Sequence, residues 1–121
     1  MVRILRSHLF KRQVLELTAD YRQRAGSPVA LKFVGQLDDA VNFIAKRPTA
    51  CPVYIWLEGK EFRKWVLKDF PVSVFFRLAD DAAITLEALY AQRMNIAARL
   101  PKDMESSSVA LDYGTRRIFR L

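Results

Sequence analysis

The segment from Val72 to Tyr90 constrains the fold of this chain more than any other. Val72–Leu78 is rich in valine and phenylalanine, and the next four residues, Ala-Asp-Asp-Ala, have the composition of a turn. A period of two follows, with Ile84, Leu86, Ala88 and Tyr90 on one side and Thr85 and Glu87 on the other. Because such alternation is typical of a half-buried strand, we predict an antiparallel β-hairpin that ends in a basic, aromatic rim.

Two amphipathic helices are predicted before this hairpin. Ser7 is a good N-cap for a helix from about His8 to Ala25, and Gly26 suits its end. Ser27 and Pro28 then start a second helix that runs to about Lys46. Their expected buried sides are Phe10, Val14, Leu17 and Tyr21 on the first helix, and Ala30, Val34, Leu37, Val41 and Ile44 on the second.

The remaining β-prone runs complete an α+β domain. Val2–Arg6 is a short first strand, and the sheet core is expected near residues 62–68, 72–78 and 83–90. Val53–Leu57 is β-prone and is left unassigned, whereas Glu58-Gly59-Lys60 is a turn signal. We therefore predict a two-helix hairpin packed on one face of a small twisted, mostly antiparallel sheet of about four strands.

The domain is expected to span residues 1–101. Residues 102–121 are predicted to be a polar link followed by a basic C-terminal tail of unassigned structure, because Pro101 is followed by a serine-rich stretch.

Charge and cysteine content limit the classes of function. Twenty Lys and Arg against thirteen Asp and Glu give a net charge of +7, which favours an acidic partner or nucleic acid. A lone Cys51 indicates a reducing compartment, so a cytoplasmic location is expected. We expect no membrane segment and no signal peptide, because no apolar run has the required length. Metals and cofactors are not expected either, since no ligand spacing or glycine-rich phosphate loop occurs.

Phe70-Pro71, the strand that ends in Phe76-Arg77, and Arg93 together resemble a known family pattern. In the ParE/RelE superfamily of type II toxin–antitoxin and plasmid stabilisation systems, a Phe-Pro-Tyr-x-Ile-x-Tyr-Arg strand precedes one that ends His-x-x-Arg. The resemblance covers about residues 2–96 and is closer to the ParE branch. Two positions depart from the pattern: Val72 replaces the usual tyrosine, and Tyr90 stands where the family often has histidine.

The resemblance implies a test for RNA cleavage. RNase members of the superfamily use several cations on the sheet to stabilise the charge that develops during attack by the 2′-hydroxyl. Lys64, Lys68 and Arg93 fall at such positions, whereas Val66 and Ser73 occupy two positions where the RNases carry Lys and Arg. Losing one electrostatic stabiliser typically costs on the order of 100- to 1,000-fold in rate. The incomplete set favours the ParE branch, which is thought to act by protein contact with DNA gyrase, and no catalytic residue is assigned.

The predicted function is therefore a growth-arresting toxin that a cognate antitoxin neutralises. The predicted residues for contact with antitoxin or target are Lys64, Lys68, Arg77, Tyr90 and Arg93. Three alternatives stay open: a RelE-like endoribonuclease that cuts mRNA on the ribosome, a decayed non-toxic member that only binds antitoxin, and a generic nucleic-acid-binding domain. Basic and aromatic residues alternate along 62–67, which suits either nucleic acid or an acidic partner. The oligomeric state is left open.

Overall fold

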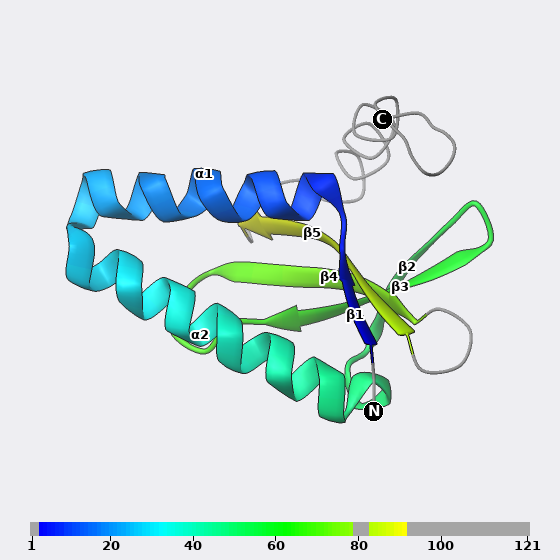
Figure 1. Ribbon diagram of the computed structural model, residues 1–121. Coiled ribbons are helices and arrows are strands. Elements are labelled where there is room, and N and C mark those ends of the chain that lie inside the picture. The colour runs from blue at the N-terminus through cyan, green and yellow to red at the C-terminus, as the bar shows by residue number, and fades with distance from the viewer. Residues whose placement is uncertain (1–2, 79–82, 92–121) are drawn as a thin grey trace.

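Two helices cover one face of a five-stranded sheet (Figure 1). The computed structural model describes residues 3–78 and 83–91. The elements follow in the order β1 (Arg3–Arg6), α1 (His8–Ala25), α2 (Ser27–Lys46), a short 3₁₀ helix (Pro48–Ala50), β2 (Val53–Leu57), β3 (Lys60–Val66), β4 (Val72–Leu78) and β5 (Ala83–Ala91). This arrangement confirms the predicted α+β fold. The predicted turn at 79–82, Arg93, and the predicted boundary at residue 101 lie outside the described residues.

Local sequence signals place the helix ends. The hydroxyl of Ser7 accepts a hydrogen bond from the amide of Phe10 at 2.9 Å, which caps the first turn of α1. The same hydroxyl donates to the carbonyl of Glu87 at 2.8 Å and so ties this cap to β5. Gly26 has a φ of 93°, which a residue with a side chain rarely adopts, and the chain turns there from α1 into α2. Both predicted helices are confirmed with their predicted ends.

The sheet has the strand order β1-β5-β4-β3-β2. Neighbouring strands are antiparallel except for β1 and β5, which run parallel, so the sheet is mixed and has one strand more than predicted. The additional strand is β2, the run that the sequence left unassigned. It joins β3 through Glu58 and Gly59, whose φ values of 52° and 76° meet the requirement of a tight two-residue hairpin turn.

One β-bulge changes the faces of β5. Phe75 pairs with Ala88 and Phe76 pairs with Leu86, so Glu87 is one extra residue in β5. Ala88 and Tyr90 therefore lie on the opposite face from Leu86. The predicted unbroken alternation was wrong here, because an inserted residue reverses which face the following side chains occupy.

The main core lies between the helices and the sheet. Its centre is aromatic: the rings of Tyr21, Phe33 and Phe70 contact one another at centroid distances of 5.0 to 5.5 Å. On α2, Phe33 and Ala40 are buried, whereas Val34, which was predicted to be buried, is 41% exposed. That part of the helix prediction was wrong because α1 meets α2 along a line slightly rotated from the predicted stripe.

Helix α1 provides a hydrogen-bond acceptor to β5 past the point where the short strand β1 ends. The side-chain oxygen of Gln13 accepts the amide of Leu89 at 2.7 Å, as a neighbouring strand would. Gln13 is itself buried, so this contact stands in for a ladder bond in the protein interior. No helix of residues 3–78 and 83–91 is long and apolar enough to cross a membrane.

Candidate partner-binding surfaces

The sheet face turned away from the helices carries its own apolar layer, and we call it the distal face. Its buried cluster comprises Leu9, Phe62, Phe75, Ala88 and Tyr90, with Ile55 and Leu57 packed against it. The ring of Phe75 meets Tyr54 at 5.4 Å and Tyr90 at 6.0 Å, both in edge-on geometry. Side chains predicted for partner contact are therefore held on a rigid aromatic floor.

Lys64 lies on the distal face, since it pairs with Phe75 across β3 and β4. Its ammonium nitrogen is 4.6 Å from the centroid of the Tyr54 ring, within the range of a cation–π contact. The contact draws Lys64 toward β2, the outermost strand of the sheet.

Arg77 lies on the same face and is held by Glu87. Its Nε is 2.7 Å from a carboxylate oxygen of Glu87, and its guanidinium carbon is 5.8 Å from the centroid of the Phe62 ring. The Glu87 side chain is only 8% exposed, whereas that of Arg77 is 26% exposed. The bulge in β5 places Glu87 beside Arg77, so the inserted residue of the bulge provides the negative charge that pairs with this predicted contact residue.

Lys68 lies at the other end of the sheet. It is exposed in the connection from β3 to β4, beyond the last pair of that ladder, Val66 and Ser73. Its neighbour Asp69 accepts a hydrogen bond of 2.6 Å from the amide of Gln36 and lies 3.5 Å from Lys32. The Gln36 hydrogen bond, with the nearby lysines, holds the pKa of Asp69 below its ordinary value. Asp69 therefore ties this connection to α2, and the adjacent Lys68 lies there, apart from Lys64 and Arg77.

Tyr90 is a buried part of the distal face, with 1% of its surface exposed. Its register partner is Ser73, which is also buried, and Val66 lies opposite Ser73 on the next strand. The two positions that lack a cation thus sit side by side on the distal face. Of the five predicted contact residues, the structure brings together Lys64, Arg77 and Tyr90, while Arg93 is outside the described residues.

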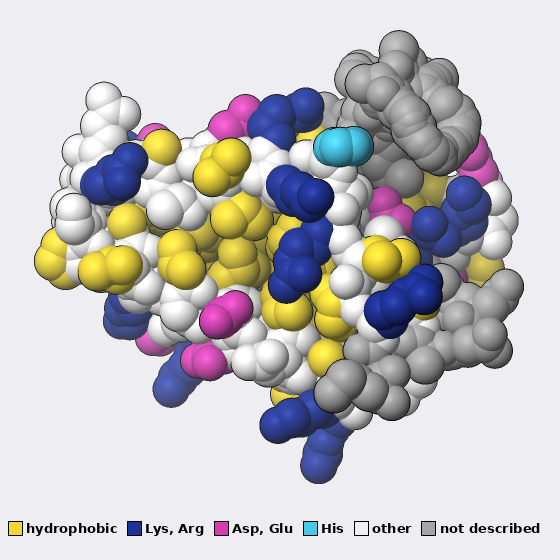
Figure 2. Space-filling view, in the orientation of Figure 1, with side chains coloured by type: hydrophobic (Ala, Val, Ile, Leu, Met, Phe, Trp, Pro, Cys, Tyr) yellow, Lys and Arg dark blue, Asp and Glu magenta, His cyan; other side chains and the backbone are white. Residues whose placement is uncertain are grey.

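A second candidate surface is an apolar groove between α1 and α2. It encloses about 370 Å³. Its lining is Arg6, Phe10, Lys11, Val14, Leu15, Val34, Leu37, Asp38 and Val41. Figure 2 shows hydrophobic side chains gathered between the helices and basic side chains at the end of this region nearest β1. Leu15 is 72% exposed although it is apolar, so solvent reaches part of the apolar lining of the groove.

The other candidates for chemistry among the described residues are metal-ligating side chains and the thiol of Cys51. Within residues 3–78 and 83–91, no three His, Cys, Asp or Glu side chains come together as a metal site. Burial raises the pKa of the Cys51 thiol, which disfavours the reactive thiolate.

Comparison with known proteins finds a likeness among solved structures. No family model and no curated protein matches the sequence. Among solved structures, a chain of the chromosomal ParDE TA system from P. aeruginosa matches with a TM-score of 0.64 and 17% sequence identity, covering 75% of this chain and 96% of that chain. The chain shares the fold of this ParDE-system chain. The likeness supports the fold that the sequence resemblance implied, and it leaves the branch within the ParE/RelE type open.

Sequence reasoning missed two surfaces of this ParE/RelE-type fold. The groove is lined partly by Leu15 and Val34, and the signal for it was Leu15, an apolar residue that falls off the predicted stripe of the first helix. Trp56 is 62% exposed on β2, whereas Trp65 packs on Phe43 at 4.3 Å between ring centroids. The alternating basic and aromatic residues of β3 do not form one surface, because successive side chains of a strand point to opposite faces.

Proposed function

We propose that this chain is the toxin of a type II toxin–antitoxin system, that it acts on its target by protein contact, and that an antitoxin neutralises it. The observation that carries the proposal is the apolar helix groove with a cationic end on a ParE/RelE-type fold. Its floor is made by residues such as Val14 and Leu37, and Arg6 and Lys11 border it. An amphipathic antitoxin segment with acidic residues at one end fits this combination in both shape and charge.

The distal face supports protein contact over RNA cleavage. Val66 and Ser73 are side by side where the RNase members carry cations. Lys64 lies over the ring of Tyr54, and Arg77 is paired with Glu87, so both cations are held in place on the distal face. Stabilising the transition state of RNA cleavage needs several cations aimed at the developing charge. In this chain two of those cation positions are occupied by Val66 and by the buried Ser73. The proposed target is DNA gyrase in the cytoplasm, with Lys64 and Arg77 as charge contacts.

Expression in a bacterial host tests the target. Growth, mRNA integrity and gyrase-dependent DNA breaks are followed in one culture after induction. The proposal predicts arrest with intact mRNA and trapped gyrase–DNA breaks. Arrest with mRNA cut within codons would instead support a ribosome-dependent RNase, and normal growth at full soluble expression would indicate a decayed toxin.

A matched pair of variants tests the antitoxin groove. Leu15 lines the groove and Leu31 does not, yet both are 72% exposed on the helices. Leu15→Glu and Leu31→Glu therefore make the same change at equal exposure. When the protein encoded by an adjacent reading frame is co-expressed, Leu15→Glu should lose rescue from arrest and weaken the purified complex by about tenfold or more. Leu31→Glu should leave both unchanged, and equal effects would refute the groove as the antitoxin site.

A further inference from the structure

The two helices diverge from the turn at Gly26, and β1 crosses the wide end of the space between them (Figure 1). The helix groove of about 370 Å³ lies toward this end, with walls from both helices and with Arg6 of β1 in its lining. Pockets that bind small molecules usually enclose about 300–1,000 Å³. The groove is therefore concave and large enough for one small ligand.

The apolar part of the groove is long and narrow. Phe10, Leu37 and Val41 are buried and form its floor, whereas Leu15 and Val34 are exposed at its rim. Val34 and Val41 are about two helical turns apart, which corresponds to about 10 Å along α2. The groove thus offers apolar contacts over this length, which suits a single alkyl chain of medium length.

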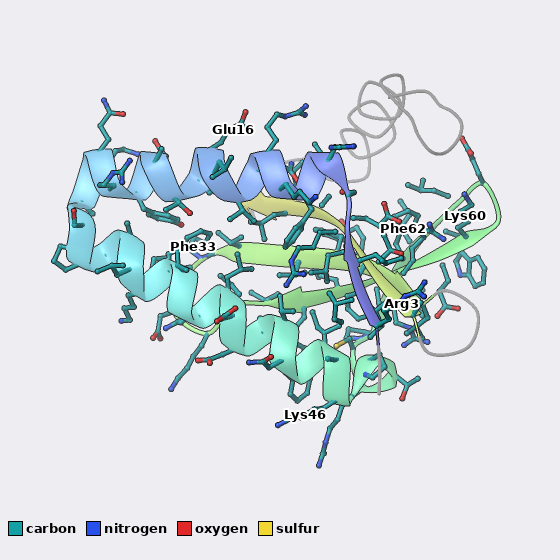
Figure 3. All side chains as sticks on the ribbon, in the orientation of Figure 1. Arg3, Glu16, Phe33, Lys46, Lys60 and Phe62 are labelled. Atoms are coloured by element: carbon teal, nitrogen blue, oxygen red, sulfur yellow. The ribbon has the colours of Figure 1, made fainter. Side chains whose placement is uncertain are left out.

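The charges of the groove are distributed unevenly. Arg6 and Lys11 are exposed at the end nearest β1, and neither forms an ion pair with another described side chain. Glu16 of α1 pairs with Arg12 instead and points away from α2 (Figure 3). Asp38 is the acidic residue of the lining and belongs to the α2 wall. An anion is therefore attracted to the end with Arg6 and Lys11 and is repelled by Asp38.

We propose that the helix groove binds a medium-chain carboxylate such as decanoate, with its alkyl chain between α1 and α2 and its carboxylate on Arg6 and Lys11. The planar guanidinium of Arg6 can donate two parallel hydrogen bonds to a carboxylate, which fixes the direction of the ligand. This site goes beyond the proposed function and does not depend on it, because the chain alone forms the groove. Where an antitoxin segment also uses the groove, the two occupants exclude each other, and the carboxylate releases the toxin.

Carboxylates of increasing chain length test the groove on the purified full chain by titration calorimetry, below the concentrations at which they form micelles. One molecule of decanoate should bind per chain. Each methylene that enters the groove should strengthen binding about threefold, so affinity should rise steeply from hexanoate to decanoate. It should then level off up to tetradecanoate, because the longer chains extend past the groove. A gain that continues through tetradecanoate would indicate nonspecific adsorption and would overturn the proposal.

Decylammonium has an alkyl chain of the same length with the opposite charge, so it is the control for the cationic end. It should bind at least about tenfold more weakly than decanoate, because it loses the charged hydrogen bonds of Arg6 and Lys11. Amide NMR shifts caused by decanoate should be largest at Val34 and Val41 and small at Phe75 on the distal face. Equal affinity of the two amphiphiles, or shifts centred on the distal face, would refute the site.

Two matched pairs of variants locate the ligand. Arg6→Gln and Arg3→Gln make the same change on β1, but Arg6 lines the groove and Arg3 lies at the far end of the strand (Figure 3). Leu15→Glu and Leu31→Glu differ in the same way on the helices. Arg6→Gln and Leu15→Glu should each weaken decanoate binding about tenfold, whereas their partners should leave it unchanged. All four positions are exposed, so the fold should be kept, and equal effects within a pair would contradict the assignment.

Competition with the protein encoded by the adjacent reading frame separates this site from the proposed function. If the two share the groove, decanoate at about ten times its Kd should weaken the complex about tenfold. If decanoate binds in the groove and the complex is unaffected, the ligand site stands and the groove fails as the antitoxin site. If decanoate does not bind while Leu15→Glu still abolishes rescue from arrest, the proposed function stands and the ligand site is refuted.

Discussion

The Arg77–Glu87 ion pair sets a measurable expectation for the distal face. The two groups meet at 2.7 Å, and their side chains are 26% and 8% exposed. Arg77→Met keeps the aliphatic stem near Phe62 and leaves the Glu87 carboxylate buried without its counter-charge. Breaking a buried pair by removing one partner costs about 3–5 kcal/mol, and the low end applies because Arg77 remains partly solvated. We expect Arg77→Met to lower the free energy of unfolding by about 3 kcal/mol.

A double-mutant cycle isolates the pair from the packing. Glu87→Gln keeps an oxygen that can accept from Arg77 and leaves a partly solvated cation, so its expected cost is about 1 kcal/mol. Removing both charges should cost about 2 kcal/mol, less than the sum of the single variants, which gives a coupling energy of about 2 kcal/mol. Urea unfolding followed by tryptophan fluorescence measures all four proteins. Costs that add within about 0.5 kcal/mol would refute the assignment of a buried, coupled pair.

The same cycle separates structure from target contact. Glu87→Gln retains the cation of Arg77, whereas Arg77→Met removes it. If Arg77 is a charge contact, induced Glu87→Gln still arrests growth and Arg77→Met does not, at matched soluble protein. If arrest instead follows the measured stability of each variant, Arg77 acts only through the fold.

Four further expectations follow from single contacts. Gln13→Ala leaves the buried amide of Leu89 without its acceptor, so unfolding free energy should fall by about 1–3 kcal/mol and exchange at Leu89 should accelerate; unchanged exchange would contradict this. Glu58→Asn puts a residue that tolerates positive φ into the hairpin turn and should raise stability by about 0.5 kcal/mol by urea midpoint, against Glu58→Val as a control that lowers it. The Gln36 hydrogen bond lowers the pKa of Asp69 from its ordinary 3.8, so the ionised Asp69 stabilises the fold above that pH and this stabilisation is lost as pH falls through the lowered pKa. The difference in unfolding free energy between the parent and Asp69→Asn should therefore disappear in strong acid. A difference that persists there would contradict the role of the Asp69 charge. Since Cys51 is buried and its thiol pKa is raised above 9.0, alkylation near neutral pH should be at least about 100-fold slower in the folded protein than in urea, and equal rates would contradict the burial.

Much of the fold follows from short-range sequence signals. Ser7 caps α1 with its own hydroxyl, and Gly26 adopts a positive φ because it has no side chain. The ends of the helices can therefore be predicted without knowing what the helices pack against. The strands β4 and β5 were predictable for a similar reason, since a β-rich run and a period of two are local. The bulge at Glu87 was not, because it depends on how β5 is paired with β4 and not on the composition of β5.

Some features of the candidate surfaces could also be predicted from the sequence alone, and others depend on how the elements pair and pack. Lys64 and Phe62 have the same parity on β3, so a shared face for them could be predicted from the strand alone. The burial of Tyr90 and the partner of Arg77 both depend on the bulge, which reversed the end of β5. The groove and the exposure of Val34 depend on the rotation of one helix against the other, which a hydrophobic pattern defines only to within about one residue position.

The parallel pairing of β1 with β5 has a consequence for how the protein is made. The first strand of the described residues pairs with the last one, and the contact between Ser7 and Glu87 spans 80 positions of the chain. On the ribosome, α1 and α2 emerge long before β5, so the inner faces of the two helices have no complete sheet to cover until Ala91 has left the exit tunnel. A chain whose synthesis has not yet passed Ala91 therefore lacks both the joined distal face and the closed core, and the described fold closes only after β5 has emerged.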